Sequence, residues 1–270
     1  MNISKNIQEF LPLVLLLSTT LAVHFVNIKP FQRGFFCDDH SLKYPFIENE
    51  TIPQYMCLLI WISISGVIIL TTQILNRSTS IKDVNRMITG LLCCILLTYV
   101  AKYSVGRLRP HFLTLCNPDY NNVCFDEEAY YYYDGEEEHL NEFYQKYVNE
   151  SKVCKNEKSH LLHEARLSFM SGHASFSFYC ATFLIMYLNI KSKQLGWMSK
   201  IAPCIQILLF VLATWISLTR ISDYYHYPFD VICGALTGVG FALYFGETEK
   251  KLDETPIVKS IHPMMNDVTL

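Results

Sequence analysis

The chain has 270 residues, of which 51% are hydrophobic and 17% charged, with a formal net charge of −3 at pH 7. This apolar content is more than a water-soluble protein can bury, so it favours a membrane protein and excludes a disordered chain. The chain has only 11 Gly, too few for collagen, and its ten Cys are spread too thinly over 270 residues for a small disulfide scaffold. The slightly acidic balance lacks the basic footprint of a nucleic-acid-binding protein, so no nucleic acid partner is expected.

Six apolar stretches approach the ~20 residues that a helix needs to cross a ~30 Å hydrocarbon core. They span residues 10–28, 55–76, 87–101, 174–190, 201–219 and 231–246. The third can extend to residue 106, and Pro228 and Phe229 can add a turn before the sixth. Because backbone polar groups cannot stay unpaired in lipid, each stretch is predicted to be a helix. The predicted fold class is an all-α integral membrane protein with six transmembrane helices, forming a single polytopic domain over residues 1–270.

The first stretch is interpreted as an anchor, because it is long for a signal peptide and no Ala-x-Ala-like site follows it. With six crossings the two ends share a side. The segments on that side carry the basic residues Lys5, Arg77, Lys82, Arg86, Lys191, Lys193, Lys200, Lys250, Lys251 and Lys259. The positive-inside rule therefore predicts cytosolic tails at residues 1–9 and 247–270.

The opposite side is expected to carry three loops, at residues 29–54, 110–166 and 220–230. Four of the ten Cys fall in these loops: Cys37, Cys116, Cys124 and Cys154. An oxidising lumen permits disulfides among them, although the sequence leaves the pairing open. The other six Cys lie within the predicted helices, where buried thiols are ordinary.

Glycosylation sequons occur at Asn2, Asn49, Asn76 and Asn149. The predicted topology places Asn2 and Asn76 in the cytosol, and Asn49 lies only a few residues before a helix. Asn149 lies well out in the long loop. A glycan is therefore predicted on Asn149 alone.

The first cluster of ionisable residues lies at the outer end of the third predicted helix. Lys102 and Arg109 are seven residues apart, which predicts that they share one face of that helix. Pro110 marks the expected end of the helix. The alternative interpretation is a pair of interfacial side chains that extend toward water.

The second cluster is Ser171-Gly172-His173, which opens the fourth predicted helix. Free backbone N–H groups and the helix dipole at such a start suit an oxyanion or a phosphate. A helix cap beside an incidental histidine would explain the same residues.

The third cluster runs from Thr219 and Arg220 to His226 and Asp230, between the fifth and sixth predicted helices. Pro228 fits a first helical turn, which brings Asp230 close behind it. A carboxylate that accepts from one ring nitrogen of His226 would leave the other nitrogen basic. A purely structural His–Asp pair is the alternative.

Each helix takes the chain to the other side of the membrane, so the end of the third helix, the start of the fourth and the end of the fifth lie on the same side. All three clusters therefore share one face of the membrane, whichever way the chain is inserted. Together they supply three fixed cations, free helix amides, two histidines and a carboxylate. This combination suits a doubly charged tetrahedral oxyanion, which is a phosphate monoester.

The three clusters resemble the motifs of the type 2 phosphatidic acid phosphatase superfamily, whose pocket is shared with vanadium haloperoxidases. Residues 102–110 resemble K-x6-R-P, residues 171–173 resemble P-S-G-H, and residues 220–230 resemble S-R-x5-H-x3-D. Met170 stands where the family usually has Pro, and Thr219 where it usually has Ser. The runs at residues 30–39, 43–45 and 102–112 look like the animal lipid phosphate phosphatases in particular.

The resemblance implies a helical catalytic core at about residues 87–246, with the active site at the outer membrane face. It implies that His226 attacks phosphorus to form a phosphohistidine, that Asp230 orients His226, and that His173 acts as general acid and then base. The implied phosphate-binding residues are Lys102, Arg109, Arg220, Ser171, Gly172 and Thr219. No metal and no cofactor are expected, because the side-chain cations take the places of magnesium.

The implied substrates are lipid phosphates in the bilayer: phosphatidic acid, lysophosphatidic acid, sphingosine 1-phosphate and ceramide 1-phosphate. The family favours the plasma membrane, while the oligomeric state, a homo-oligomer included, stays open. The alternatives are an isoprenoid diphosphate phosphatase or glucose 6-phosphatase, a non-catalytic signalling scaffold, a transporter or channel, and a metallohydrolase that uses His173, His226 and Asp230 as ligands.

Overall fold

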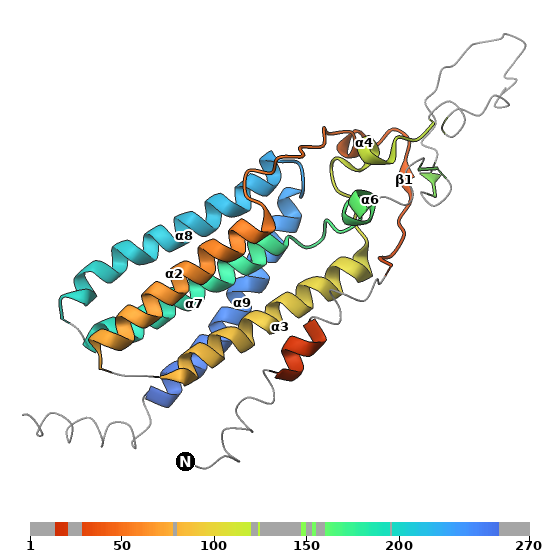
Figure 1. The fold of residues 1–270 in the computed structure, drawn as a ribbon. Coiled ribbons are helices and arrows are strands. Elements are labelled where there is room, and N and C mark those ends of the chain that lie inside the picture. The colour runs from red at the N-terminus through yellow and green to blue at the C-terminus, as the bar shows by residue number, and fades with distance from the viewer. Residues whose placement is uncertain are drawn as a thin grey trace, which may run out of the picture.

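The computed structural model describes residues 14–20, 29–77, 80–119, 124, 147–149, 153–154, 160–194 and 196–253. Long helices run side by side along one axis, as Figure 1 shows. They are α2 (Gln54–Leu75), α3 (Ile81–Val105), α7 (Gly172–Lys191), α8 (Met198–Ser222) and α9 (Pro228–Asp253). The prediction of a helix is confirmed for these five apolar stretches. Of the stretch 10–28, residues 14–20 are helical and the others lie outside the described residues.

Within the described residues, four helices are long and apolar enough to cross a membrane: α2, α3, α8 and the part of α9 from Pro228 to Gly246. The fifth, α7, contacts all four of them and therefore forms the centre of the bundle. Large apolar side chains on α2 and α8 are exposed, as a lipid-facing surface requires. They include Leu59, Ile62, Val67, Leu70, Ile74, Ile207, Leu208, Phe210, Val211 and Trp215.

Helices α7 and α9 approach each other backbone to backbone. A Cβ added to Gly234 would lie 2.5 Å from the carbonyl oxygen of Ser171, and one added to Gly238 would lie 2.3 Å from that of Ser175. The two glycines are four residues apart, the spacing that lets membrane helices pack closely. This contact fixes the start of α7 against the start of α9, where the amide of Ser171 donates to the carbonyl of Asp230 at 3.1 Å.

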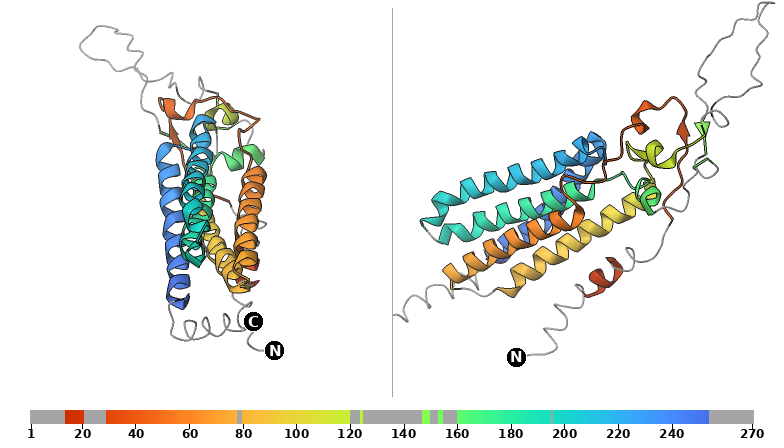
Figure 2. Two further views of the ribbon diagram at one scale, coloured as in Figure 1. Left: turned by 90° about the vertical axis from the view of Figure 1, so that its left-hand side faces the viewer. Right: turned by 45° about the horizontal axis from the view of Figure 1, so that its top comes forward.

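Short elements gather at one end of the bundle, where α3 and α8 end and α7 and α9 begin (Figures 1 and 2). They are β1 (Phe35–Phe36), η1 (His40–Leu42), α4 (Phe112–Cys116), β2 (Tyr147–Val148) and α6 (His160–Glu164), while η3 (Ser192–Gln194) follows α7. Strands β1 and β2 pair antiparallel.

Two disulfides join segments of this end of the molecule. Cys37 is bonded to Cys124, and Cys116 to Cys154. The four cysteines are those that the sequence assigned to the outer loops, and the structure supplies the pairing. Asn149, the predicted glycosylation site, is exposed directly after β2.

Candidate active site

The three sequence clusters meet at the end of the bundle that carries the short elements. Lys102 lies at the end of α3, Ser171 caps α7, Arg220 lies in the last turn of α8 and Asp230 in the first turn of α9. His226 lies between α8 and α9 and is almost fully buried. The structure therefore brings together all the predicted site residues except the glycan acceptor: Lys102, Arg109, Ser171, Gly172, His173, Thr219, Arg220, His226 and Asp230.

Lys102 and Arg109 reach this site by a different route from the predicted one. Helix α3 ends at Val105, and Gly106 follows in the left-handed conformation with φ 56°. A Cβ there would lie 1.9 Å from the carbonyl oxygen of Phe31, so only glycine fits. The prediction that Lys102 and Arg109 share one helix face is wrong, because Arg109 lies beyond the helix on the returning chain.

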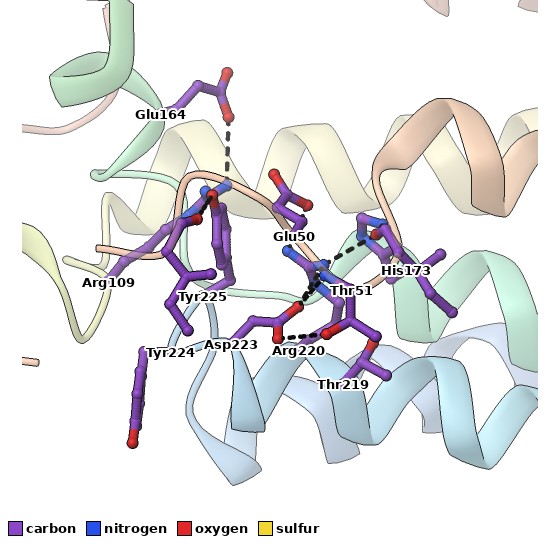
Figure 3. Close-up of polar contacts among 12 residues, drawn as sticks. Glu50, Thr51, Arg109, Glu164, His173, Thr219, Arg220, Asp223, Tyr224 and Tyr225 are labelled. Carbon is purple, nitrogen blue, oxygen red and sulfur yellow. Dashed lines mark hydrogen bonds and ion pairs between the residues drawn. The ribbon is translucent and has the colours of Figure 1, made fainter. Parts of the chain in front are cut away.

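Two buried arginines lie on either side of the Tyr225 ring (Figure 3). The guanidinium carbons of Arg109 and Arg220 lie 5.1 and 4.5 Å from its centroid. Their Nη2 atoms meet carboxylates of other segments, Glu164 at 3.3 Å and Glu50 at 2.9 Å. Burial and the neighbouring Glu50 raise the pKa of Tyr225 to about 12, so its hydroxyl keeps its proton and donates to the carbonyl of Ile47.

Three buried donors in this cluster have no hydrogen-bond partner among the described residues. They are Nε of Arg109, Nε of Arg220 and the hydroxyl of Ser171. A buried polar group without a partner costs free energy, so such groups mark strain or a place for a ligand. Two guanidinium N–H donors and a hydroxyl are the donors that a phosphate accepts from.

Gly172 and Lys102 lie next to each other at the start of α7. A Cβ added to Gly172 would lie 3.9 Å from Cε of Lys102, whose ammonium donates to the carbonyl of Leu167 at 2.6 Å. Thr219 is also close, but its hydroxyl donates to the carbonyl of Ile216 in its own helix at 2.7 Å. The hydroxyl of Thr219 can therefore only accept from a ligand, unless it first leaves that carbonyl.

His226 is oriented by a backbone carbonyl. Its Nδ1 lies 2.6 Å from the carbonyl oxygen of Ser168, which only accepts, so Nδ1 carries the hydrogen and Nε2 has the free lone pair. The predicted direct hydrogen bond from His226 to Asp230 is wrong. The fully buried Asp230 carboxylate instead accepts from Arg107 at 2.7 Å, from the Ser168 hydroxyl at 2.6 Å and from the Tyr227 amide at 3.2 Å. Asp230 is thus linked to His226 by hydrogen bonds through Ser168.

The environment of His226 keeps its ring neutral. Burial is the largest cause that lowers the pKa of His226 well below its usual value, and the cations Lys102, Arg109 and Arg220 lower it further. A neutral imidazole with a free lone pair on Nε2 is the form of histidine that can act as a nucleophile.

His173 is oriented in the opposite sense. Its Nε2 lies 3.1 Å from the carbonyl oxygen of Ile52, so Nε2 carries the hydrogen and Nδ1 is the nitrogen left for exchange of a proton. The same carbonyl accepts from Nη1 of Arg220, also at 3.1 Å. One carbonyl therefore links His173 with Arg220.

Sequence reasoning missed the residues that hold the histidines. Ser168 and Ile52 act through their backbone carbonyls, which leave no mark in the sequence. Arg107 could have been found, because it is an additional cation within the first cluster, and it pairs with Asp230 and lies over the Tyr227 ring at 4.3 Å. Within the described ranges, no three His, Cys, Asp or Glu side chains converge as a metal site would.

The region that contains the three clusters matches a known protein family. The PAP2 superfamily matches residues 83–251, which is more than half of the chain and includes all three clusters. The chain belongs to this superfamily. No solved structure matches the chain at a significant level.

Among PAP2 relatives, phospholipid phosphatase 1 of Rattus norvegicus is 35% identical over 231 residues, which cover 79% of this chain and 74% of the relative. Phospholipid phosphatase 2 of Homo sapiens is 32% identical over 242 residues, covering 83% and 76%. These relatives place the chain in the animal lipid phosphate phosphatase branch of the PAP2 superfamily.

Proposed function

We propose that the chain hydrolyses the phosphate monoester of membrane lipids, with lysophosphatidic acid, phosphatidic acid, sphingosine 1-phosphate and ceramide 1-phosphate as its substrate class. Membership of the lipid phosphate phosphatase branch supports the reaction. The helices that surround the site are apolar enough to lie in a bilayer, which supports a lipid substrate whose phosphate reaches the ends of the helices.

One observation carries this proposal. Three buried donors that have no hydrogen-bond partner in the described part of the chain lie around two histidines, of which one has Nε2 free and the other Nδ1. Nε of Arg109, Nε of Arg220 and the hydroxyl of Ser171 would bind the phosphate oxygens, together with Lys102 and the amide end of α7. Positioning and charge supply most of the catalysis of phosphoryl transfer.

In the first step, Nε2 of His226 attacks phosphorus and the bond from phosphorus to the lipid oxygen breaks. Nδ1 of His173 holds a proton while the dianionic phosphate balances the neighbouring cations, and it gives this proton to that oxygen, which leaves as the alcohol. The product on the enzyme is a phosphohistidine at His226, whose ring hydrogen stays bound to the Ser168 carbonyl.

In the second step, Nδ1 of His173 takes a proton from water, and the resulting hydroxide attacks phosphorus. The bond to Nε2 of His226 breaks and inorganic phosphate leaves, so both histidines return to their starting forms. Arg107, Ser168 and Asp230 hold the ring of His226 through both steps, and no step needs a metal.

We propose further that the chain crosses the bilayer six times, with both termini in the cytosol and the site at the outer or luminal face of the plasma membrane. The disulfides near the site support this orientation, because they form in oxidising compartments. It predicts a glycan on Asn149. A modified Asn76, or a mass shift that survives Asn149→Gln, would overturn this assignment of the two sides.

The test is phosphate release from micellar lysophosphatidic acid and sphingosine 1-phosphate in excess EDTA, with the parent protein and His226→Ala compared at equal amounts. The parent should stay active in the chelator, while His226→Ala should lose at least about a thousandfold in rate. An EDTA-sensitive parent would favour a metallohydrolase. A parent protein that binds these lipids but releases no phosphate from them would favour a signalling scaffold.

A further inference from the structure

Three residues directly before α2, Glu50, Thr51 and Ile52, contact the site from outside the three sequence clusters. We call them the 50–52 segment. Glu50 binds Nη2 of Arg220, and the carbonyl of Ile52 binds both His173 and Arg220. The segment lies before residue 83, where the match to the PAP2 superfamily begins.

Thr51 connects this segment to the third cluster. Its amide donates to Oδ2 of Asp223 at 2.9 Å, and its hydroxyl donates to Oδ1 of the same carboxylate at 2.8 Å (Figure 3). Asp223 is buried, directly follows α8, and lies 3.7 Å from Nη1 of Arg220. Thr51 is therefore held at two atoms by the chain that carries Arg220 and His226.

Formation of α2 does not explain these bonds. A threonine before a helix ordinarily caps it by accepting from a free amide of the first turn. Here Pro53 is the N-cap, no side chain caps the helix, and the Thr51 hydroxyl bonds to a residue 172 positions away. The hydrogen bonds of Thr51 thus fix the position of the 50–52 segment relative to the end of α8. They do not cap α2.

The carbonyl of Ile52 is the part of the segment that has chemical consequences. An oxygen with two lone pairs accepts from two donors here, Nε2 of His173 and Nη1 of Arg220, each at 3.1 Å. Because the carbonyl only accepts, it fixes the hydrogen of His173 on Nε2. If it moved, the ring of His173 would lose its only hydrogen bond among the described residues and could rotate.

We propose that Thr51 is a positioning residue for His173. Its two hydrogen bonds to Asp223 hold the Ile52 carbonyl in place, and this carbonyl turns Nδ1 of His173 toward the oxygen of the leaving alcohol. The inference rests on the proposed function, because it takes His173 as the general acid. It implies that the site is built for alkyl phosphates, whose alkoxides need a proton to leave.

The test varies the leaving group. Single-turnover release of the alcohol is measured in mixed micelles with lysophosphatidic acid and with a nitrophenyl phosphate that bears an alkyl tail. A nitrophenolate leaves without a proton, so only the first substrate depends on the orientation of His173. Thr51→Val keeps the side-chain shape but loses the hydroxyl, and it should lower the rate with lysophosphatidic acid about tenfold while changing the aryl rate less than about twofold.

Two further variants complete the experiment. Thr51→Ser keeps the hydroxyl and should restore the rate with lysophosphatidic acid. Thr114→Val is the matched control, because the hydroxyl of Thr114 donates to the carbonyl of Tyr44 at 2.7 Å and does not touch the site, so both rates should stay at the parent value. An equal loss on both substrates in Thr51→Val, or a failure of Thr51→Ser to restore the rate, would overturn the inference.

His173→Ala separates this inference from the proposed function. That variant should lose alcohol release from lysophosphatidic acid and keep the first turnover of the aryl substrate. If His173→Ala loses both reactions equally, the general-acid role fails and the inference fails with it. If His173→Ala is selective and Thr51→Val is not, the inference alone is overturned.

Discussion

The two histidines of the site are held by very different surroundings. His226 is buried and bonded to Ser168, which is in turn bonded to a fully buried Asp230 and its partner Arg107. His173 is half-buried and bonded to one carbonyl of a segment that precedes α2. A nucleophile needs a fixed ring in one charge state, whereas a group that gives and takes a proton needs access to substrate and water.

The largest effect is expected from Asp230→Ala, which removes the carboxylate behind the partner of His226. It leaves the partly exposed Arg107 guanidinium and the buried Ser168 hydroxyl without their partner, which costs roughly 1–3 kcal/mol of folding free energy. We expect kcat to fall about a hundredfold, because a small displacement of the reacting ring is enough for that loss. Asp230→Asn keeps one acceptor and should lose less. Steady-state kinetics together with thermal unfolding in detergent checks both variants, and equal activity of Asp230→Ala and the parent would contradict the arrangement.

Ser168→Ala tests a single link of the same network. It removes the hydroxyl bond to Asp230 but keeps the carbonyl that binds His226, so we expect kcat to fall about tenfold with KM unchanged. Ser217→Ala is the matched control, because Ser217 is equally buried and its hydroxyl donates to the carbonyl of Ala213 in its own helix. A larger loss in Ser217→Ala than in Ser168→Ala would show that the kinetic effect is one of folding alone.

The buried histidines also predict how stability depends on pH. Burial, with help from nearby arginines, lowers the pKa of His111 to about 4, and the pKa of His226 is also lowered. The unfolded chain then binds more protons than the folded one below about pH 6.5, so stability is lost as pH falls through that value. The unfolding midpoint in detergent should drop by about 2–4 °C for each kcal/mol lost.

His111→Asn tests this dependence, because Asn can still donate to the carbonyl of Tyr224, which His111 approaches at 2.9 Å, but does not titrate. The variant should therefore show a smaller fall between pH 7.5 and pH 5.5 than the parent. The same slope in both proteins would mean that His111 contributes nothing to the pH dependence.

The smallest effect is expected at the exposed rim of the site. The Glu164 side chain is 42% exposed and lies 3.3 Å from Nη2 of Arg109, so it competes only weakly with a phosphate for that guanidinium. Glu164→Gln should lower KM for lysophosphatidic acid about twofold with kcat unchanged, since a surface ion pair contributes roughly 0–1 kcal/mol. Glu48→Gln, an exposed carboxylate of the same loop region as Glu50, is the control. A higher KM in Glu164→Gln would mean that Glu164 helps to position Arg109.

The sequence predicted what depends on side-chain type and missed what depends on the backbone. Apolar length located the helices, and charge at their ends located the site. The helix end was misplaced because Pro110 was given more weight than Gly106, whose left-handed conformation stops α3 earlier. The partners of both histidines were missed because they are the backbone carbonyls of Ser168 and Ile52. Every residue has a backbone carbonyl, so the sequence does not mark these two.

The close contact of α7 with α9 has a mechanical consequence. Because Gly234 and Gly238 bring the two backbones together, the two helices would respond to a thicker or thinner bilayer as one rigid strut. Ser171 and Asp230 lie at the same end of that strut. Changes in lipid composition would then tilt Ser171 and Asp230 together while the distance between these two residues stays the same.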